Sequence, residues 1–190
     1  TVAQIGEAVR FVRERTGENT YIVVDNCYGE FTETTEPTAV GVDMIIGSLI
    51  KNPGGGMADT GGYICGTKRA VELAGNHLCC PGVGLDAGAS LGQNRNMLRG
   101  LFYAPHTVAQ AIKTAHLAAY MFEKAGFDVL PGPFERRSDI IQTVSLKTPE
   151  KLCRFCQGIQ AASPVDAHVV PEPWDMPGYA DPVIMAAGAF

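Results

Sequence analysis

Apolar residues at helical spacing open the chain and predict an amphipathic helix over residues 2–16, which Gly17 ends. Three short segments follow, and each predicts a strand: the fully apolar run at residues 21–24, and the mainly apolar segments at 43–50 and 61–66. Continuous apolar strands after a helix are typical of a parallel sheet with both faces covered. The pattern therefore predicts an α/β fold.

Two further helices are expected in the middle of the chain. Thr67 is a suitable N-cap for a helix over residues 68–78. The longest helix candidate covers residues 105–125, where apolar side chains recur on one face. Pro105 suits the first turn of this helix, and Gly126 ends it.

The chain changes character after Gly126, where residues 127–130 and the prolines that follow indicate a linker. We therefore expect two units, one over residues 1–126 and one over residues 127–190. Three elements are predicted in the second unit: a strand at 139–146, a helix at 149–162 that starts with proline, and a strand at 183–190. Because that last apolar run reaches the end of the chain, we expect a segment of a longer protein.

Composition excludes several classes of partner. The chain has 15 basic and 20 acidic residues, a net charge of −5 and no basic run, which argues against nucleic acid. The apolar runs are too short to span a bilayer, so no membrane partner is expected. Six cysteines in 190 residues are too sparse for a disulfide scaffold and favour a reducing compartment. We expect a cytoplasmic protein.

Neither the cysteines nor the four histidines have the spacing of a metal site. Cys153 and Cys156 share one face of a predicted helix, but a redox or zinc role needs a favourable helix start or a second ligand pair. Cys79 and Cys80 are expected to be structural. No metal ligand is therefore predicted.

The candidate functional residues lie where two apolar strands end. Asp25 follows the first of these strands and Lys51 follows the second, and ligands of open parallel sheets bind at this edge. A lysine that leaves a buried strand suits a Schiff base to a carbonyl cofactor, and a carboxylate suits the pyridine nitrogen of pyridoxal phosphate. Ser48 would reach a phosphate oxygen, and Tyr28 would donate to the phenolate oxygen of the ring. On spacing alone, a solvated turn lysine is the competing interpretation.

The glycine run Gly54–Gly56 directly follows this lysine turn. It is not a phosphate-binding P-loop, because the lysine precedes the glycines. Two interpretations are open: glycines that let the backbone approach the site closely, and an ordinary tight turn.

Two motifs carry a resemblance to a known family: Asp-Asn-Cys-Tyr-Gly-Glu-Phe at residues 25–31 and Gly-Ser-Leu-Ile-Lys-Asn-Pro-Gly-Gly-Gly at residues 47–56. They resemble the aluminium resistance protein family, which is related to cystathionine and methionine gamma-lyases. The resemblance extends to Pro-Trp-Asp-Met-Pro-Gly-Tyr at residues 173–179 and so covers essentially the whole chain. It implies an aspartate-aminotransferase-like pyridoxal-phosphate fold of type I, with the later half of the large domain in residues 1–126 and part of the α+β small domain in residues 127–190.

The resemblance also implies roles for single residues. Lys51 would be the Schiff-base lysine, Asp25 the partner of the pyridine nitrogen, and Ser48 a ligand of the phosphate. Tyr28 matches an Asp-x-x-Tyr pattern known mainly from aminotransferases. Ile50 replaces the hydroxyl residue that precedes the lysine in related lyases, so one phosphate contact is absent or supplied elsewhere.

The lysine pattern of the wider superfamily also includes Gly-x-Asp, which residues 41–43 match. A complete protein of this kind has further parts that these 190 residues lack: a loop that holds the phosphate, an aromatic ring that stacks on the cofactor, and an arginine for the substrate carboxylate. The resemblance therefore implies an incomplete pocket.

The expected activity is a pyridoxal-phosphate-dependent carbon–sulfur lyase reaction, a β- or γ-elimination on a cystathionine- or methionine-type amino acid. Burial and the cofactor would keep the Lys51 amine partly neutral, so that it takes the α proton. Another reaction of the same cofactor (transamination, decarboxylation or aldol cleavage) and a non-catalytic fragment or structural module are the alternatives. The expected partners are a small amino-acid substrate and further copies of the protein in a dimer or tetramer.

Overall fold

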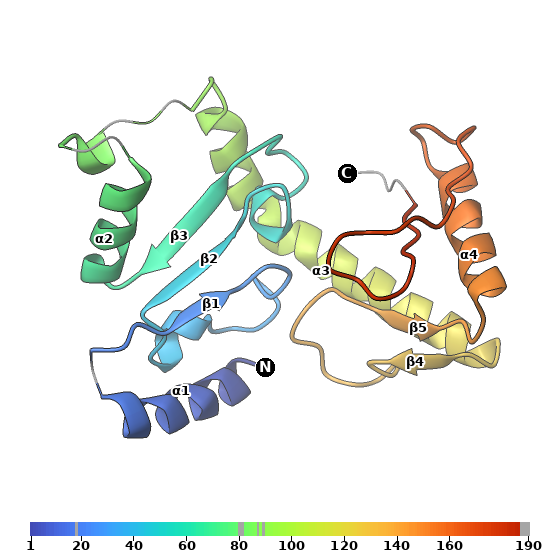
Figure 1. Cartoon of the computed structure of the whole chain (residues 1–190), viewed down its shortest axis with the longest axis horizontal. Helices are drawn as coiled ribbons and strands as arrows, with labels where there is room; N and C mark the ends of the chain where they lie inside the picture. Colours follow the sequence, from blue (N-terminus) through green and yellow to red (C-terminus); the bar gives the residue numbers. More distant parts are fainter. Residues whose placement is uncertain (18, 80–81, 87, 89, 187–190) are drawn as a thin grey trace.

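The computed structural model describes residues 1–186 except 18, 80–81, 87 and 89 (Figure 1). Its larger sheet has three strands in the order β1 (Val23–Asp25), β2 (Met44–Ser48) and β3 (Gly62–Gly66). β1 and β2 are parallel, as predicted, with Asp25 opposite Ile46. β3 runs antiparallel to β2, so the prediction of a purely parallel sheet was wrong. The reason lies in the connection, because a compact turn around the 3₁₀ helix η2 (Asn52–Gly54) returns the chain without a crossover helix.

Helix α1 (Val2–Thr16) covers one face of this sheet and has the predicted bounds. Thr1 and Gln4 form a capping box at its start, and Gly17 ends it with a φ of 71°. Val9 of this helix forms a buried cluster with Val42 and Ile45. The hydrophobic core of the sheet is therefore on the α1 side.

The opposite face of the sheet is more open than the sequence predicts. Val23 is 45% exposed and Ile46 is 36% exposed, although both were expected to be covered. Helix α2 (Lys68–Leu78) contacts β3 and is capped by Thr67, whose hydroxyl accepts from the Ala70 amide. Among the described residues, the prediction of a sheet covered on both faces was therefore wrong.

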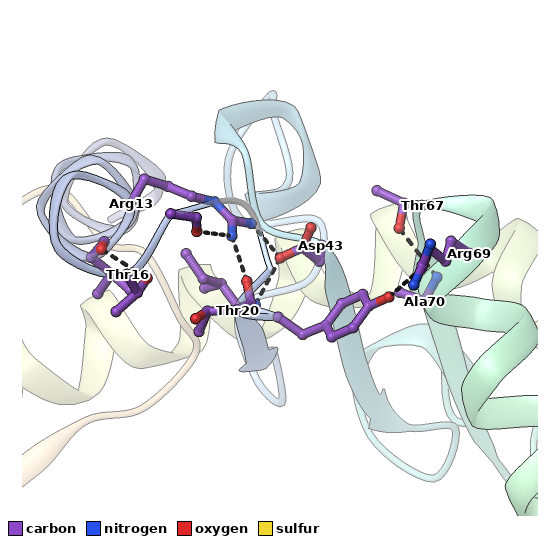
Figure 2. A network of polar contacts seen from close by, with 11 residues as sticks. Arg13, Thr16, Thr20, Asp43, Thr67, Arg69 and Ala70 are labelled. Carbon is purple, nitrogen blue, oxygen red and sulfur yellow. Dashed lines mark hydrogen bonds and ion pairs between the residues drawn. The ribbon is translucent and has the colours of Figure 1, made fainter.

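A polar network at the start of β2 joins the sheet to α1 (Figure 2). The Asp43 carboxylate forms an ion pair with Arg13 and accepts a hydrogen bond from the Ile22 amide at 2.7 Å. Arg13 also donates to the carbonyl of Thr20. Asp43 belongs to the Gly-x-Asp pattern, but it precedes the start of β2, whereas Lys51 follows the end of that strand. Its contacts are those of a structural residue.

Replacing Asp43 with asparagine should lower the free energy of unfolding by about 2 kcal/mol, because the change removes the partly buried ion pair and weakens the bond to the Ile22 amide. Urea unfolding measures the change. Glu72→Gln is the control, because its pair with Lys68 is exposed and 3.8 Å long, and it should cost less than about 0.5 kcal/mol. Equal losses in the two variants would contradict the structural role of Asp43.

Helix α3 (Asn94–Lys124) begins eleven residues before the predicted start, and Pro105 lies inside it. The prediction used the usual exclusion of proline from helix interiors, which costs about 3 kcal/mol. Packing offsets this cost, because Ala104 is fully buried and Gly100 lies against η2. The helix passes from the sheet to the C-terminal elements (Figure 1).

The C-terminal part contains a small antiparallel sheet and one helix: β4 (Asp128–Leu130), β5 (Thr143–Ser145) and α4 (Pro149–Ala162). The prediction of a linker at 127–130 was wrong, because residues 128–130 form β4 and pair with β5. The bounds of α4 are confirmed, and Thr148 caps it. The strand predicted at 139–146 is confirmed only at residues 143–145.

The strand predicted at the end of the chain falls partly outside the described residues, because 187–190 are not described. In the described part, Val183 pairs with Trp174 in an isolated antiparallel bridge. The division at residue 126 stays a prediction. No helix in the described ranges combines the length and the hydropathy that crossing a bilayer requires.

Candidate functional site

The structure brings Lys51 and Tyr28 into contact, with the lysine Nζ 4.5 Å from the centroid of the tyrosine ring. Lys51 lies three residues after β2, and Tyr28 lies three residues after β1. Because these strands are parallel neighbours, their carboxyl ends deliver both side chains to one edge of the sheet. This contact between an amine and a ring face is a cation–π interaction.

Asp25 is the last residue of β1, at the same edge of the sheet as the lysine. Its Oδ1 accepts a hydrogen bond from the Cys27 amide at 3.1 Å. Hydrogen bonds from Cys27 lower the pKa of the Asp25 carboxyl, and the nearby charge of Lys51 lowers it further. The carboxylate therefore stays ionised at neutral pH.

The Lys51 amine has a raised pKa. Partial desolvation lowers this pKa, but the contacts with Cys27 and Tyr28 raise it by more. Lys51 is half-buried at the edge of an open sheet, so burial alone does not make the amine neutral. Burial therefore favours the neutral amine, as expected, but the contacts with Cys27 and Tyr28 outweigh it in the chain as described, and the neutral amine beside a bound cofactor stays a prediction.

The loop that carries Tyr28 has an unusual backbone. Tyr28 has a φ of 73° and Phe31 a φ of 61°, values that bulky residues rarely adopt. The Glu36 carboxylate stabilises the loop by accepting hydrogen bonds from the Phe31 amide and from Asn26 Nδ2, both at 3.0 Å. Strain of this kind is often found at functional sites, where surrounding structure maintains it.

Ser48 ends β2 and lies opposite Gly62 of β3. Asp25 pairs with Ile46, two residues before Ser48, so strand alternation puts Asp25 and Ser48 on the same face of the sheet. The phosphate contact of Ser48 stays a prediction. A cavity of about 180 Å³ lies beside Asp25, but neither Lys51 nor Ser48 lines it.

Gly54 and Gly55, in the turn after Lys51, pack against Gly100 of α3. A Cβ on Gly54 would lie 1.6 Å from the carbonyl oxygen of Leu49, and one on Gly55 would lie 2.4 Å from that of Gly100. The tight-turn interpretation is confirmed. The proposed approach of this backbone to the cofactor has no support from these contacts.

A buried polar network lies behind the site, and the sequence interpretation missed it. Glu30 is 3% exposed and Asn52 is 6% exposed. Tyr63 donates its hydroxyl hydrogen to Glu30 Oε1 at 2.7 Å, and Asn52 Nδ2 donates to the Glu30 carbonyl at 3.0 Å. Burial raises the pKa of the Glu30 carboxyl, and burial beside this carboxyl raises the pKa of Tyr63. The available signal was Glu30 and Asn52 themselves, which are polar residues in the same two motifs as Asp25 and Lys51.

The cysteines of the described residues are unpaired: Cys27, Cys65, Cys79, Cys153 and Cys156. Cys80 lies outside the described residues. In the described ranges, no three or more histidine, cysteine, aspartate or glutamate side chains form a group that could hold a metal ion.

Comparison with known proteins identifies the family of the chain. The family model described as methionine gamma-lyase matches residues 1–190. YnbB of Bacillus subtilis is 50% identical over the whole chain, which covers 45% of that protein. A 33.9 kDa protein from Lactobacillus delbrueckii subsp. bulgaricus is 49% identical, and the chain covers 62% of it. The chain thus spans about half the length of the curated relatives it matches.

Solved structures of lyase-named proteins are also similar to the chain. A Listeria monocytogenes protein named "putative cystathionine beta-lyase involved in aluminum resistance" is 52% identical and superposes with a TM-score of 0.93. The chain is covered completely and corresponds to 47% of that protein. A carbon-sulfur lyase involved in aluminum resistance from Clostridium novyi is 49% identical, with a TM-score of 0.91 over the whole chain and 44% of the relative.

The fold is mixed α/β, and the family match and the similar solved structures relate the chain to carbon-sulfur lyases. The chain belongs to the methionine gamma-lyase family.

Proposed function

We propose that this chain supplies the lysine-bearing part of the cofactor site in a pyridoxal-phosphate-dependent carbon–sulfur lyase. The observation that carries the proposal is the Lys51 amine, which lies 4.5 Å from the Tyr28 ring and whose charge lowers the pKa of Asp25. Membership of the methionine gamma-lyase family supports the same assignment. The finer fold assignment, an aspartate-aminotransferase-like fold of type I, is part of this proposal.

The residues present fit pyridoxal phosphate in their chemistry. Lys51 provides the primary amine that a carbonyl group requires. Asp25 provides a carboxylate with a lowered pKa, which suits a protonated pyridine nitrogen. Ser48 provides a hydroxyl on the same face of the sheet as Asp25. The Asp25 carboxylate and the Lys51 amine thus lie at one edge of the sheet, where they would serve the pyridine nitrogen and the carbonyl group of the cofactor.

When bound, the cofactor supplies an electron sink for a carbanion at the α carbon of an amino acid. Lys51 Nζ would hold and move protons next to it. Its raised pKa means that the amine carries a proton at neutral pH, whereas uptake of the α proton needs the neutral amine. Cys27 and Tyr28 therefore influence how readily Lys51 exchanges its proton.

The substrate class follows from family membership and from the names of the relatives. We propose β- or γ-elimination on a cystathionine- or methionine-type amino acid, because similar proteins are named carbon-sulfur and cystathionine beta-lyases. Free cysteines at the described positions support a reducing, cytoplasmic location. The exposed Val23 and Ile46 face supports assembly with further protein, which we propose to be a homo-oligomer.

The nature of the products tests the reaction type. In a protein that contains this chain at the length of its relatives, incubation with cystathionine should release a keto acid, ammonia and a thiol in equal amounts. Chromatography and an ammonia assay measure these products. Transamination is the competing reaction, since the Asp25–Tyr28 spacing matches aminotransferases. Formation of a keto acid together with a new amine, without ammonia, would contradict the lyase proposal.

A further inference from the structure

Glu30 is a buried carboxylate beside the candidate site that the proposed chemistry does not use. It lies two residues after Tyr28 and is 3% exposed. Its Oε1 accepts the hydroxyl hydrogen of Tyr63, while its Oε2 is buried without a hydrogen-bond partner in the described structure. Burying an incompletely bonded carboxyl group costs free energy, so other contacts of Glu30 must offset this cost.

The main chain of Glu30 holds the turn that carries Lys51. Asn52 directly follows Lys51 and begins η2. Its Nδ2 donates to the Glu30 carbonyl at 3.0 Å, and this hydrogen bond is buried. The loop of Tyr28 and the turn of Lys51 are therefore joined to each other behind the amine–ring contact.

The side chain of Glu30 connects the same loop to the sheet. It lies over Gly47 of β2, where an added Cβ would be 2.6 Å from Glu30 Oε1. The same Cβ would be 2.4 Å from the Tyr63 ring, so Gly47 leaves room for both side chains. Glu30 thus contacts β2, β3 and the Lys51 turn at once.

From these contacts we propose that Glu30 is a positioning residue for Lys51. Held by Tyr63 and placed over Gly47, Glu30 fixes the loop against the sheet. The fixed loop and the Asn52 bond then set the 4.5 Å separation of Lys51 Nζ from the Tyr28 ring. The inference rests on the proposed function, in which Lys51 does the chemistry and a misplacement of about 1 Å can cost about 10²-fold in rate.

Glu30→Ala, in a protein that contains this chain at the length of its relatives, tests the proposal. The first measurement is the pH dependence of Lys51 acylation without cofactor, followed by peptide mass spectrometry. The amine should leave Cys27 and Tyr28, so its pKa should fall toward the ordinary value of a lysine. The second measurement is kinetic: kcat should fall at least tenfold, with a change in KM below about threefold.

Two substitutions serve as matched controls. Glu30→Gln keeps the side-chain volume and an oxygen that accepts from Tyr63. The acid dissociation constant of Lys51 and kcat should therefore both stay within about threefold of the unmodified protein. Glu33→Gln changes a carboxylate of the same loop that instead contacts Arg136 and the Val2 amide. It should leave the Lys51 pKa and kcat unchanged. A purely structural role of Glu30 would lower stability without moving either quantity.

Tyr63→Phe is the second test if Glu30→Ala does not fold, because it removes only the hydroxyl that holds Glu30. It should lower the Lys51 pKa and kcat in the same direction by a smaller factor. Unchanged values in a folded Glu30→Ala protein, or in Tyr63→Phe when the alanine variant does not fold, would overturn the positioning role. An unmodified protein in which Lys51 never binds pyridoxal phosphate would instead overturn the proposed function.

Discussion

Replacing Lys51 with alanine should remove the attachment point of pyridoxal phosphate and lower kcat/KM by about 10⁴-fold, in a protein that contains this chain at the length of its relatives. The reason is that the Lys51 amine lies against the Tyr28 ring and its charge acts on the Asp25 carboxylate. Borohydride reduction followed by peptide mass spectrometry should show a pyridoxyl adduct at residue 51 in the unmodified protein and none in the variant.

Two further substitutions separate chemistry from structure. Lys51→Arg keeps the positive charge next to the Tyr28 ring but cannot form the adduct, so it should fold and remain inactive. Lys68→Ala is the control, because its amine is exposed and pairs only with Glu72; activity should stay within about twofold. An adduct that persists in Lys51→Ala would show that the lysine assignment is wrong.

Replacing Gly54 with alanine should give the largest loss of stability, above about 4 kcal/mol. The added Cβ would lie 1.6 Å from the carbonyl oxygen of Leu49. Both groups belong to the backbone of the Lys51 turn, so the turn must open to relieve the overlap and must move away from Gly100 of α3. Denaturant unfolding and soluble yield measure this effect, and the pyridoxyl adduct at Lys51 should decrease with it.

Gly56→Ala is the matched control two residues away. Gly56 has a φ of 74°, but no atom lies within 4 Å of an added Cβ, so the cost should be only about 1–2 kcal/mol of backbone strain. If Gly54→Ala were no more destabilising than Gly56→Ala, the close contact between the Lys51 turn and its surroundings would be contradicted.

Local patterns predicted the helices well. α1 and α4 have the predicted bounds, and α2 begins after Thr67 as expected, because each is specified by a cap and by its own apolar spacing. α3 shows the limit of such patterns. Pro105 argued for a helix start, while the buried contacts of Gly100 and Ala104 extend the helix through it.

The sequence by itself determined which residues stand at the strand ends. Asp25, Tyr28, Ser48 and Lys51 follow from two apolar runs and their neighbouring motifs, and the structure confirms that the two strands are parallel neighbours. Their chemical roles stay predictions. This much is local information, because a strand and the residue after it lie next to each other in the chain.

Only the tertiary structure decided the direction of β3, the packing role of Gly54 and the raised pKa of Lys51. It also placed the Glu30 carboxylate between Tyr63 and the Lys51 turn. These features depend on contacts between residues far apart in the chain. Desolvation and hydrogen bonding act through such contacts, and no pattern of neighbouring residues specifies them.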